Sequence, residues 1–208
     1  MSEPSQPAVD PALVARVKGI LLQPKAEWAR IDGEFATTQS LFTRYAMILA
    51  AIGPVCGLIG GQLLPVFGVR MPIVGAVVVA VVSYLLSLAA VFVLGLIINA
   101  LAPSFGGASN QVQAMKVAVY SWTAAWLAGV FGLIPVLGVL AILGLYSFYL
   151  LYVGLPILMK TPQDKTVGYF IVIVLLGIVA SVIISSVVGV VSMSFMATGA
   201  MFAGLSGL

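Results

Sequence analysis

The stretch VGYFIVIVLLGIVASVIISSVVGVVS, residues 167–192, decides the fold class of this protein. It contains no Asp, Glu, Lys or Arg, and no charged residue follows Lys165 anywhere in the chain. About 20 apolar residues are enough for a helix to cross the hydrocarbon core of a bilayer. The stretch therefore predicts a membrane-spanning helix.

The composition of the whole chain agrees with this prediction. Of the 208 residues, 62% are hydrophobic and 7% are charged, whereas about 25% of the residues of a soluble domain are charged. Such a chain cannot cover a water-soluble globule, which excludes a soluble enzyme, a nucleic-acid-binding domain and a disordered protein. It also lacks the apolar and polar alternation of an outer-membrane barrel. We expect an all-α, polytopic helical membrane protein.

Charged residues and turn formers divide the chain into five uncharged runs long enough to span a bilayer. The run between Lys116 and Lys160 is too long for one helix, and Gly132 and Pro135 supply a hairpin near its middle. The predicted spans of this five-helix bundle are 42–67, 72–101, 113–133, 136–159 and 167–192. Alternatively, residues 117–159 form one span and a re-entrant piece, which would give four spans.

The regions outside the spans are assigned from composition. Residues 1–10 read as a disordered cytoplasmic tail, residues 37–195 as the transmembrane domain, and residues 196–208 as a flexible extracytoplasmic tail. Residues 11–36 read as short amphipathic helices that begin after Asp10 and at Pro24. We expect these helices to lie on the membrane surface with Trp28 at headgroup depth. In the alternative, they pack on the protein's own loops.

The basic residues predict the orientation of the bundle. In the five-span arrangement, eight of the nine Lys and Arg residues fall on one side and Arg70 alone on the other. By the positive-inside rule, the N-terminus is cytoplasmic and the C-terminus lies outside, as in a bacterial inner-membrane protein. No cleavable signal peptide is visible, so the first span is expected to act as the insertion signal.

The chain offers little for catalysis. It has no His and one Cys, and its spans hold no charged residue away from their ends. We therefore expect no catalytic residue, no metal and no cofactor. The expected partners are anionic lipid headgroups, other membrane proteins or a second copy of the chain, but no nucleic acid. A candidate cytoplasmic recognition face comprises Arg16, Lys18, Lys25, Trp28, Arg30, Lys160, Asp164 and Lys165.

Small residues recur every four positions in two spans, which gives each helix a flat face for close packing. We expect these faces to pack within one bundle or, alternatively, to form a homodimer contact. They are Gly53, Gly57 and Gly61 in the first span, and Gly177, Ser181, Ser185 and Gly189 in the last. Pro54 lacks an amide hydrogen, so it is expected to kink or break the first span.

A few polar side chains inside the spans support alternative functions. Gln62 and Asn99 are expected to make interhelical hydrogen bonds, but they could also line the path of a small transporter or channel. Ser83, Tyr84 and Ser87 could form part of the polar groove of a lipid scramblase.

The most specific sequence is YSFYLLYVGLPILMKTPQDKTVGYFIV, residues 146–172. Its Tyr-rich helix, its GLP, its KTPQDK loop and its Gly-Tyr pair resemble the bacterial branch of the Yip1 family. The positions that carry the resemblance, here and in the first span, are Gly53, Pro54, Tyr152, Pro156, Pro162, Gly168 and Tyr169.

The resemblance implies a five-helix membrane protein with a cytoplasmic N-terminus. Eukaryotic members of the family are linked to Rab GTPases and vesicle traffic, and carry an acidic-hydrophobic-x-Gly-Pro motif. Here Ala51 and Ile52 precede Gly53-Pro54, so the acidic residue is missing. The expected function is non-enzymatic: organising the membrane or binding partners.

Overall fold

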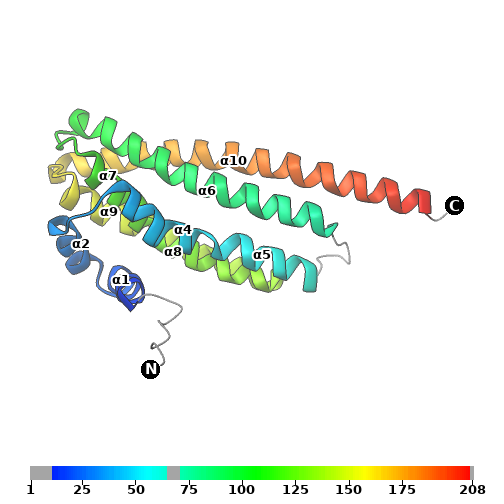
Figure 1. Ribbon diagram of the computed structural model, residues 1–208. Coiled ribbons are helices and arrows are strands. Elements are labelled where there is room, and N and C mark those ends of the chain that lie inside the picture. The colour runs from blue at the N-terminus through cyan, green and yellow to red at the C-terminus, as the bar shows by residue number, and fades with distance from the viewer. Residues whose placement is uncertain (1–10, 65–70, 207–208) are drawn as a thin grey trace, which may run out of the picture.

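The computed structural model describes residues 11–64 and 71–206, and every regular element within these ranges is a helix. The all-α prediction is therefore confirmed for the described chain. Figure 1 shows an elongated bundle, with the two N-terminal helices against one end and the last helix running along its whole length. The expected disordered tail, residues 1–10, lies outside the described residues.

The N-terminal half contains two short helices followed by an interrupted first long helix. In chain order these elements are α1 (Pro11–Leu22), α2 (Pro24–Gly33), α3 (Thr38–Leu41), the π-helical turn η1 (Phe42–Ala46), α4 (Met47–Ala50) and α5 (Ile52–Leu63). The remaining elements are α6 (Ile73–Leu101), η3 (Ala102–Phe105), α7 (Gln111–Ser121), α8 (Thr123–Ala128), η4 (Gly129–Leu133), η5 (Pro135–Leu145), α9 (Tyr146–Leu158) and α10 (Gln163–Ser206).

Four helical stretches are long and apolar enough to cross a membrane: Thr38–Leu63, Ile73–Phe105, Val136–Leu158 and Gln163–Ala197. They coincide with four of the five predicted spans. The segment predicted to span at 113–133 instead divides into α7, α8 and the 3-10 helix η4. Every residue of this segment except Trp122 is helical. The turn at Trp122 therefore divides it, and the structure contains no single long helix there.

The first long helix is broken where Pro54 predicts it. α4 ends at Ala50, four residues before the proline, and α5 begins at Ile52. That spacing is expected, because the proline ring clashes with the carbonyl group four positions earlier and cannot donate a hydrogen bond to it. Pro156 behaves differently, because α9 continues across it to Leu158.

The two ends of the last predicted span differ from expectation. α10 is one helix from Gln163 to Ser206, so the segment expected to be a flexible tail, 196–208, is helical as far as Ser206. α6 and α10 run side by side (Figure 1), and Gly75 of α6 lies against the ring of Phe195.

The hairpin predicted between Gly132 and Pro135 is present, with η4 and η5 meeting at Ile134.

Candidate functional site

α1 and α2 dock onto the side of the bundle at one end. Trp28 is fully buried, its ring meets Tyr120 edge-on at 6.3 Å between centroids, and it fits a recess that only glycine at position 154 leaves open. Ile20 and Ile31 are buried in the same core. The indole of Trp28 is therefore enclosed by the protein itself and is not exposed to lipid headgroups.

A buried lysine fastens the end of α2. The Lys116 side chain rises from α7, is 2% exposed, and donates hydrogen bonds to the carbonyl oxygens of Ile31 at 2.9 Å and Glu34 at 2.6 Å. Backbone carbonyls near a helix end are unpaired acceptors, and a buried ammonium needs such partners. Lys116 thus has a structural role and is not available to an external ligand.

Arg16 is also committed to contacts inside the protein. Its guanidinium donates to the carboxylates of Glu27 and Glu34, and it lies over the ring of Tyr120 at 5.6 Å. Burial lowers the pKa of Arg16, but the Glu34 hydrogen bond and the neighbouring negative charges outweigh it and raise that pKa. Arg16 therefore stays protonated as the centre of a network, and its placement in a recognition face is not supported.

The loop after α9 is tied to α2 by an ion pair. Lys160 Nζ lies 2.5 Å from Asp32 Oδ2, and Gln113 donates to the same aspartate. Lys160 adopts a φ of 55°, a left-handed conformation that a non-glycine residue adopts only when its surroundings hold it there. The loop at 106–110 is bonded to the same region, because the Ala108 amide donates a hydrogen bond to the Met159 carbonyl oxygen at 2.7 Å.

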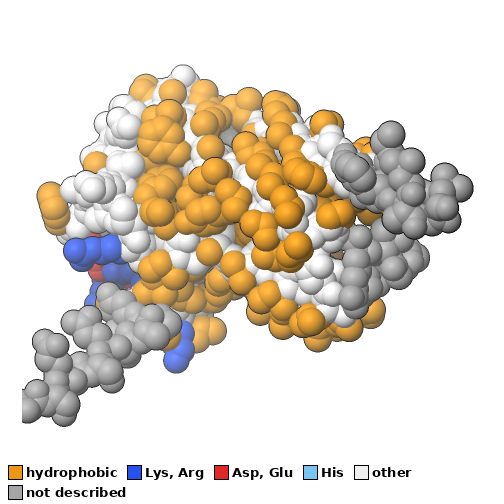
Figure 2. Space-filling view, turned by 45° about the vertical axis from the view of Figure 1, so that its right-hand side comes forward, with side chains coloured by type: hydrophobic (Ala, Val, Ile, Leu, Met, Phe, Trp, Pro, Cys, Tyr) orange, Lys and Arg blue, Asp and Glu red, His pale blue; other side chains and the backbone are white. Residues whose placement is uncertain are grey.

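We call this region, made of α1, α2 and the loops at 106–110 and 159–162, the charged end. All eight described Lys and Arg residues belong to it or to the helix turns beside it, and Figure 2 shows the visible ones gathered there. Elsewhere the visible face is mostly apolar (Figure 2). The predicted face residues that remain exposed are Lys18, Lys25, Arg30, Lys160, Asp164 and Lys165.

Sequence reasoning missed the acidic partners and Lys116. Three of the six acidic residues in the chain, Glu27, Asp32 and Glu34, fall within eight positions. In a chain with so few charges, that clustering was a signal for an ion-pair network. It could not identify the partners, because Arg16, Lys116 and the acidic residues meet only after α1 and α2 fold back on the bundle.

The residues that carry the family resemblance differ in burial. Tyr169 is fully buried, stacks on Phe105 with centroids 5.0 Å apart, and donates to the Ile98 carbonyl. It thereby joins the start of α10 to the end of α6. Tyr152 is 41% exposed and meets Phe170 edge-on, while Pro162 is exposed in the loop.

The two predicted glycine faces have different outcomes. Gly53 lies against Gly129, and Gly57 borders Gly132, so α5 and η4 approach closely there. Gly60 makes the tightest contact, because a Cβ added to it would lie 2.2 Å from the Gly132 carbonyl oxygen. Gly61, by contrast, would meet nothing within 4 Å.

The glycine face in α10 does not pack within the described chain. A Cβ added at Gly177 or Gly189 would meet nothing within 4 Å, and Ser181 and Ser185 are exposed. The expectation that this face packs inside one bundle is therefore not met.

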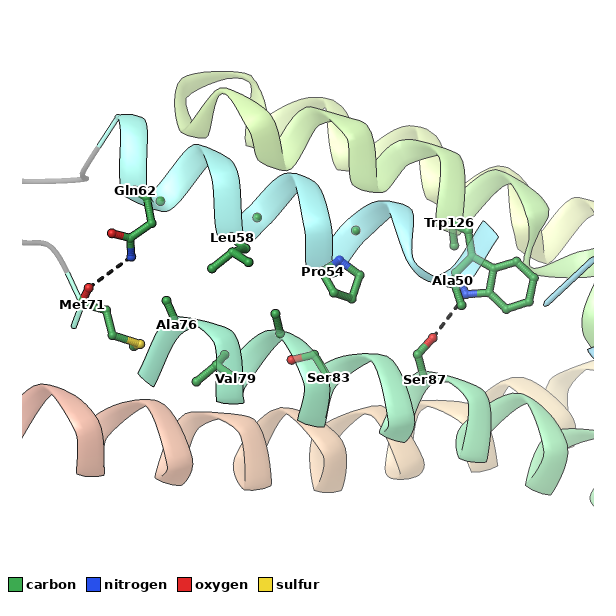
Figure 3. Close-up of a pocket in the computed structure, with 15 residues that line it drawn as sticks. Ala50, Pro54, Leu58, Gln62, Met71, Ala76, Val79, Ser83, Ser87 and Trp126 are labelled. Atoms are coloured by element: carbon green, nitrogen blue, oxygen red, sulfur yellow. Dashed lines mark hydrogen bonds between the residues drawn. The ribbon is translucent and has the colours of Figure 1, made fainter. Parts of the chain in front are cut away.

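A cleft of about 560 Å³ separates α5 from α6 (Figure 3). Gly53, Gly57 and Gly61 line it from α5, together with Pro54 and Leu58, which point toward α6. Its other wall is α6, from Ala76 to Ser87, and Ala125 and Trp126 of α8 close its inner end.

Hydrogen bonds mark the two ends of this cleft. At one end Gln62 donates to the Met71 carbonyl at 3.1 Å, and at the other Trp126 donates from its indole nitrogen to Ser87 at 3.2 Å (Figure 3). Ser83 lines the wall between them. Asn99 is elsewhere and accepts from Ser109, so of the two intramembrane amides only Gln62 lines the cleft.

Comparison with known proteins gives the family. The Yip1 domain matches residues 18–184, which is most of the chain. The chain belongs to the Yip1 family. The match runs from the second half of α1 into α10, so it includes the cleft and most of the charged end of this Yip1-family protein.

The inner membrane protein YohC of Escherichia coli strain K12 is similar to this Yip1-family protein. The two are 26% identical over 165 residues, which cover 75% of this chain and 85% of YohC. YohC of Escherichia coli O6:H1 strain CFT073 matches with the same figures. No solved structure matches. Together with the four apolar helices, the family and this relative support an inner-membrane location.

Proposed function

We propose that this Yip1-family protein is a non-enzymatic inner-membrane protein that organises the membrane around it by binding anionic lipid headgroups at its charged end. The observation that carries the proposal is the location of the described cations. All eight lie at or beside one end of the bundle, and Lys18, Lys25 and Lys165 there are exposed with no ion pair among the described residues.

The proposal includes five spans, with the charged end in the cytoplasm and the C-terminus outside. The helices from Gln111 to Leu133 have a summed length of about 35 Å, and those from Pro135 to Leu158 about 42 Å. Each arm of this hairpin exceeds the thickness of the hydrocarbon core, about 30 Å. An interrupted arm can cross when the neighbouring helices satisfy its freed backbone groups.

The fixed docking of α1 and α2 supports the binding role. Lys116, Arg16 and Trp28 hold these helices against the bundle, so their outward cations are presented at a constant position. Each Lys or Arg near an anionic membrane surface contributes about 1 kcal/mol of attraction. Three such cations on a fixed frame would gather anionic lipid around the protein without any chemical step.

Two measurements test the proposal. Cysteine labelling from either side of the membrane, in a Cys56→Ala background, checks that the charged end is cytoplasmic. Lipid retained by the purified protein is then compared between wild type and K18Q/K25Q/K165Q, with K18R/K25R/K165R as the control that keeps the charge.

We expect the Gln variant to lose its enrichment in phosphatidylglycerol and the Arg variant to keep it. Equal enrichment in all three proteins would refute the lipid-binding role. If cross-linking in native membranes instead captures one defined protein that the Gln variant loses, the charged end binds a protein partner.

The cleft between α5 and α6 favours a second candidate function, the transfer of lipid between leaflets. Its wall carries the Ser83 hydroxyl, which has no hydrogen bond within the described chain and is open to a polar headgroup. Flipping of fluorescent lipid in proteoliposomes tests this function. A transporter or channel has less support, because hydrogen bonds tie α5 to the residues just before α6, and α6 to α8, at the two ends of the cleft.

A further inference from the structure

The cleft is part of a larger separation between two membrane-spanning helices. A second hollow of about 270 Å³ borders Pro54, Leu58 and Ala80, three residues that also line the cleft. Its other lining residues are apolar apart from the Tyr84 phenol, which is itself hydrogen-bonded to the Met47 carbonyl. α5 and α6 therefore leave open space between them at both hollows, which is large enough to hold part of another molecule.

The bilayer is the natural source of this occupant. The Gln62 to Met71 hydrogen bond ties α5 to the residues just before α6 at one end of the cleft, and the Trp126 to Ser87 hydrogen bond marks the other end. A molecule that enters between these two ends must come from the side, between α5 and α6. The side of a membrane-spanning helix pair faces lipid.

The dimensions of the cleft decide which part of a lipid or protein fits it. From Ala50 to Gln62 the α5 side measures about 18 Å, at 1.5 Å per residue. The full empty volume of about 1150 Å³ over that length gives a mean cross-section of about 64 Å². An α-helix about 10 Å across needs about 80 Å², so a helix of a partner protein is too wide. A single hydrocarbon chain is narrow enough.

The chemistry of the walls agrees with a hydrocarbon chain. Leu58, Val79 and Ala80 give an apolar surface, and the glycines of α5 let a chain approach the helix backbone. No charged residue lines the cleft. Ser83 makes no hydrogen bond within the described chain, and the Ser87 hydroxyl is used by Trp126. The cleft therefore offers contact area rather than a set of polar ligands.

We propose that the cleft between α5 and α6 is a binding site for one hydrocarbon chain of a membrane lipid, which enters from the side and reaches the Trp126 and Ser87 end. The site lies among the spanning helices, away from the charged end. The proposal for this site does not depend on headgroup binding at Lys18, Lys25 and Lys165. It also does not require the lipid to cross the membrane.

The experiment uses the full-length protein in nanodiscs that contain phosphatidylcholine with a photoreactive diazirine at the end of one chain. After illumination, peptide mass spectrometry measures the label on Trp126 relative to the label on Leu175, which is 57% exposed on α10 and reports bulk lipid. Two filling variants, Gly57→Leu and Gly61→Leu, are used because an added Cβ meets nothing within 4 Å at either position.

We expect each filling variant to lower the Trp126 to Leu175 ratio about tenfold. That change corresponds to about 1.4 kcal/mol, which lies within the cost of overfilling a packed interior. The control Gly189→Leu, made at an equally open glycine outside the cleft, should leave the ratio unchanged. Size-exclusion chromatography and thermal unfolding check that each variant is folded. If one filling variant does not fold, the other is sufficient for the test.

A second control separates a chain from a polar ligand. Ser83→Ala removes the free hydroxyl without filling the cleft, so it should keep the wild-type ratio. An absent Trp126 label in wild type, or a ratio that the filling variants do not change, would overturn the proposal. A loss of label in Ser83→Ala as large as in Gly57→Leu would overturn it too, because the occupant would then be held by a hydrogen bond.

Discussion

Gly60 and Gly61 lie next to each other in α5, and the structure predicts opposite outcomes when each is changed to alanine. A methyl group on Gly60 would lie 2.2 Å from the carbonyl oxygen of Gly132 and 2.6 Å from that of Leu133. Ordinary contact begins near 3.4 Å, so α5 and η4 would have to separate by about 1.2 Å. On Gly61 the same methyl group meets nothing within 4 Å.

The magnitude follows from a comparison of the two variants. Both gain the same helix propensity, about 1 kcal/mol in favour of Ala over Gly, so that contribution cancels. The clash at Gly60 remains, and overpacking costs about 1–3 kcal/mol. For a chain of this length, 1 kcal/mol corresponds to about 2–4 °C in Tm. Gly60→Ala is therefore expected to unfold about 6 °C below Gly61→Ala.

The assay is thermal unfolding of the purified variants in one detergent, followed as the fraction that still elutes as a single species after heating. The same two proteins can be compared at several heating rates, because membrane proteins often unfold irreversibly. Equal unfolding temperatures for the two variants, or a lower value for Gly61→Ala, would refute the close approach of α5 and η4.

Trp28→Ala should lower the free energy of unfolding by about 3–5 kcal/mol, the usual cost of deleting a large buried aromatic, whereas Phe35→Ala, at a position 95% exposed, should change it little; equal thermal shifts would contradict this. Lys116→Met removes two hydrogen bonds and leaves the Glu34 carbonyl without its Lys116 partner, at a cost of about 1–3 kcal/mol, so limited proteolysis should cut the linker after α2 faster, and an unchanged rate would exclude the fastening role. Gly107→Ala places a methyl group 2.7 Å from a backbone carbonyl oxygen and should lower Tm, while Gly138→Ala meets nothing within 4 Å and should not.

Local features of the chain predicted much of the fold. The uncharged runs located four of the long helices, three of them to within a few residues at both ends, because the distance between charges limits where a helix can cross a bilayer. Pro54 and the pair Gly132 and Pro135 located the break and the hairpin, because their backbone restrictions act within a few residues. The interruption between α7 and α8 at Trp122 has no comparable signal in the sequence.

The candidate sites were less predictable. The exposed cations at Lys18, Lys25 and Lys165 could be named from charge alone, because few other surfaces can accommodate them. Arg16 and Trp28 were assigned to the same face because both lie in the short helices expected on the membrane surface. Spacing does not tell whether the outer side of a short helix meets lipid headgroups or another part of the chain, and here Tyr120 and Gly154 receive the two side chains.

The sequence by itself determined that this protein is an all-α membrane protein with its cations concentrated in a few segments, since both properties depend on local composition. Only the tertiary structure decided that Gly60 rather than Gly61 contacts η4, because neighbouring residues point about 100° apart around a helix and the sequence does not fix the rotation. The same holds for the cleft. Gly57 and Ser83 lie in different helices, and the space between them exists only once α5, α6 and α8 have taken their places.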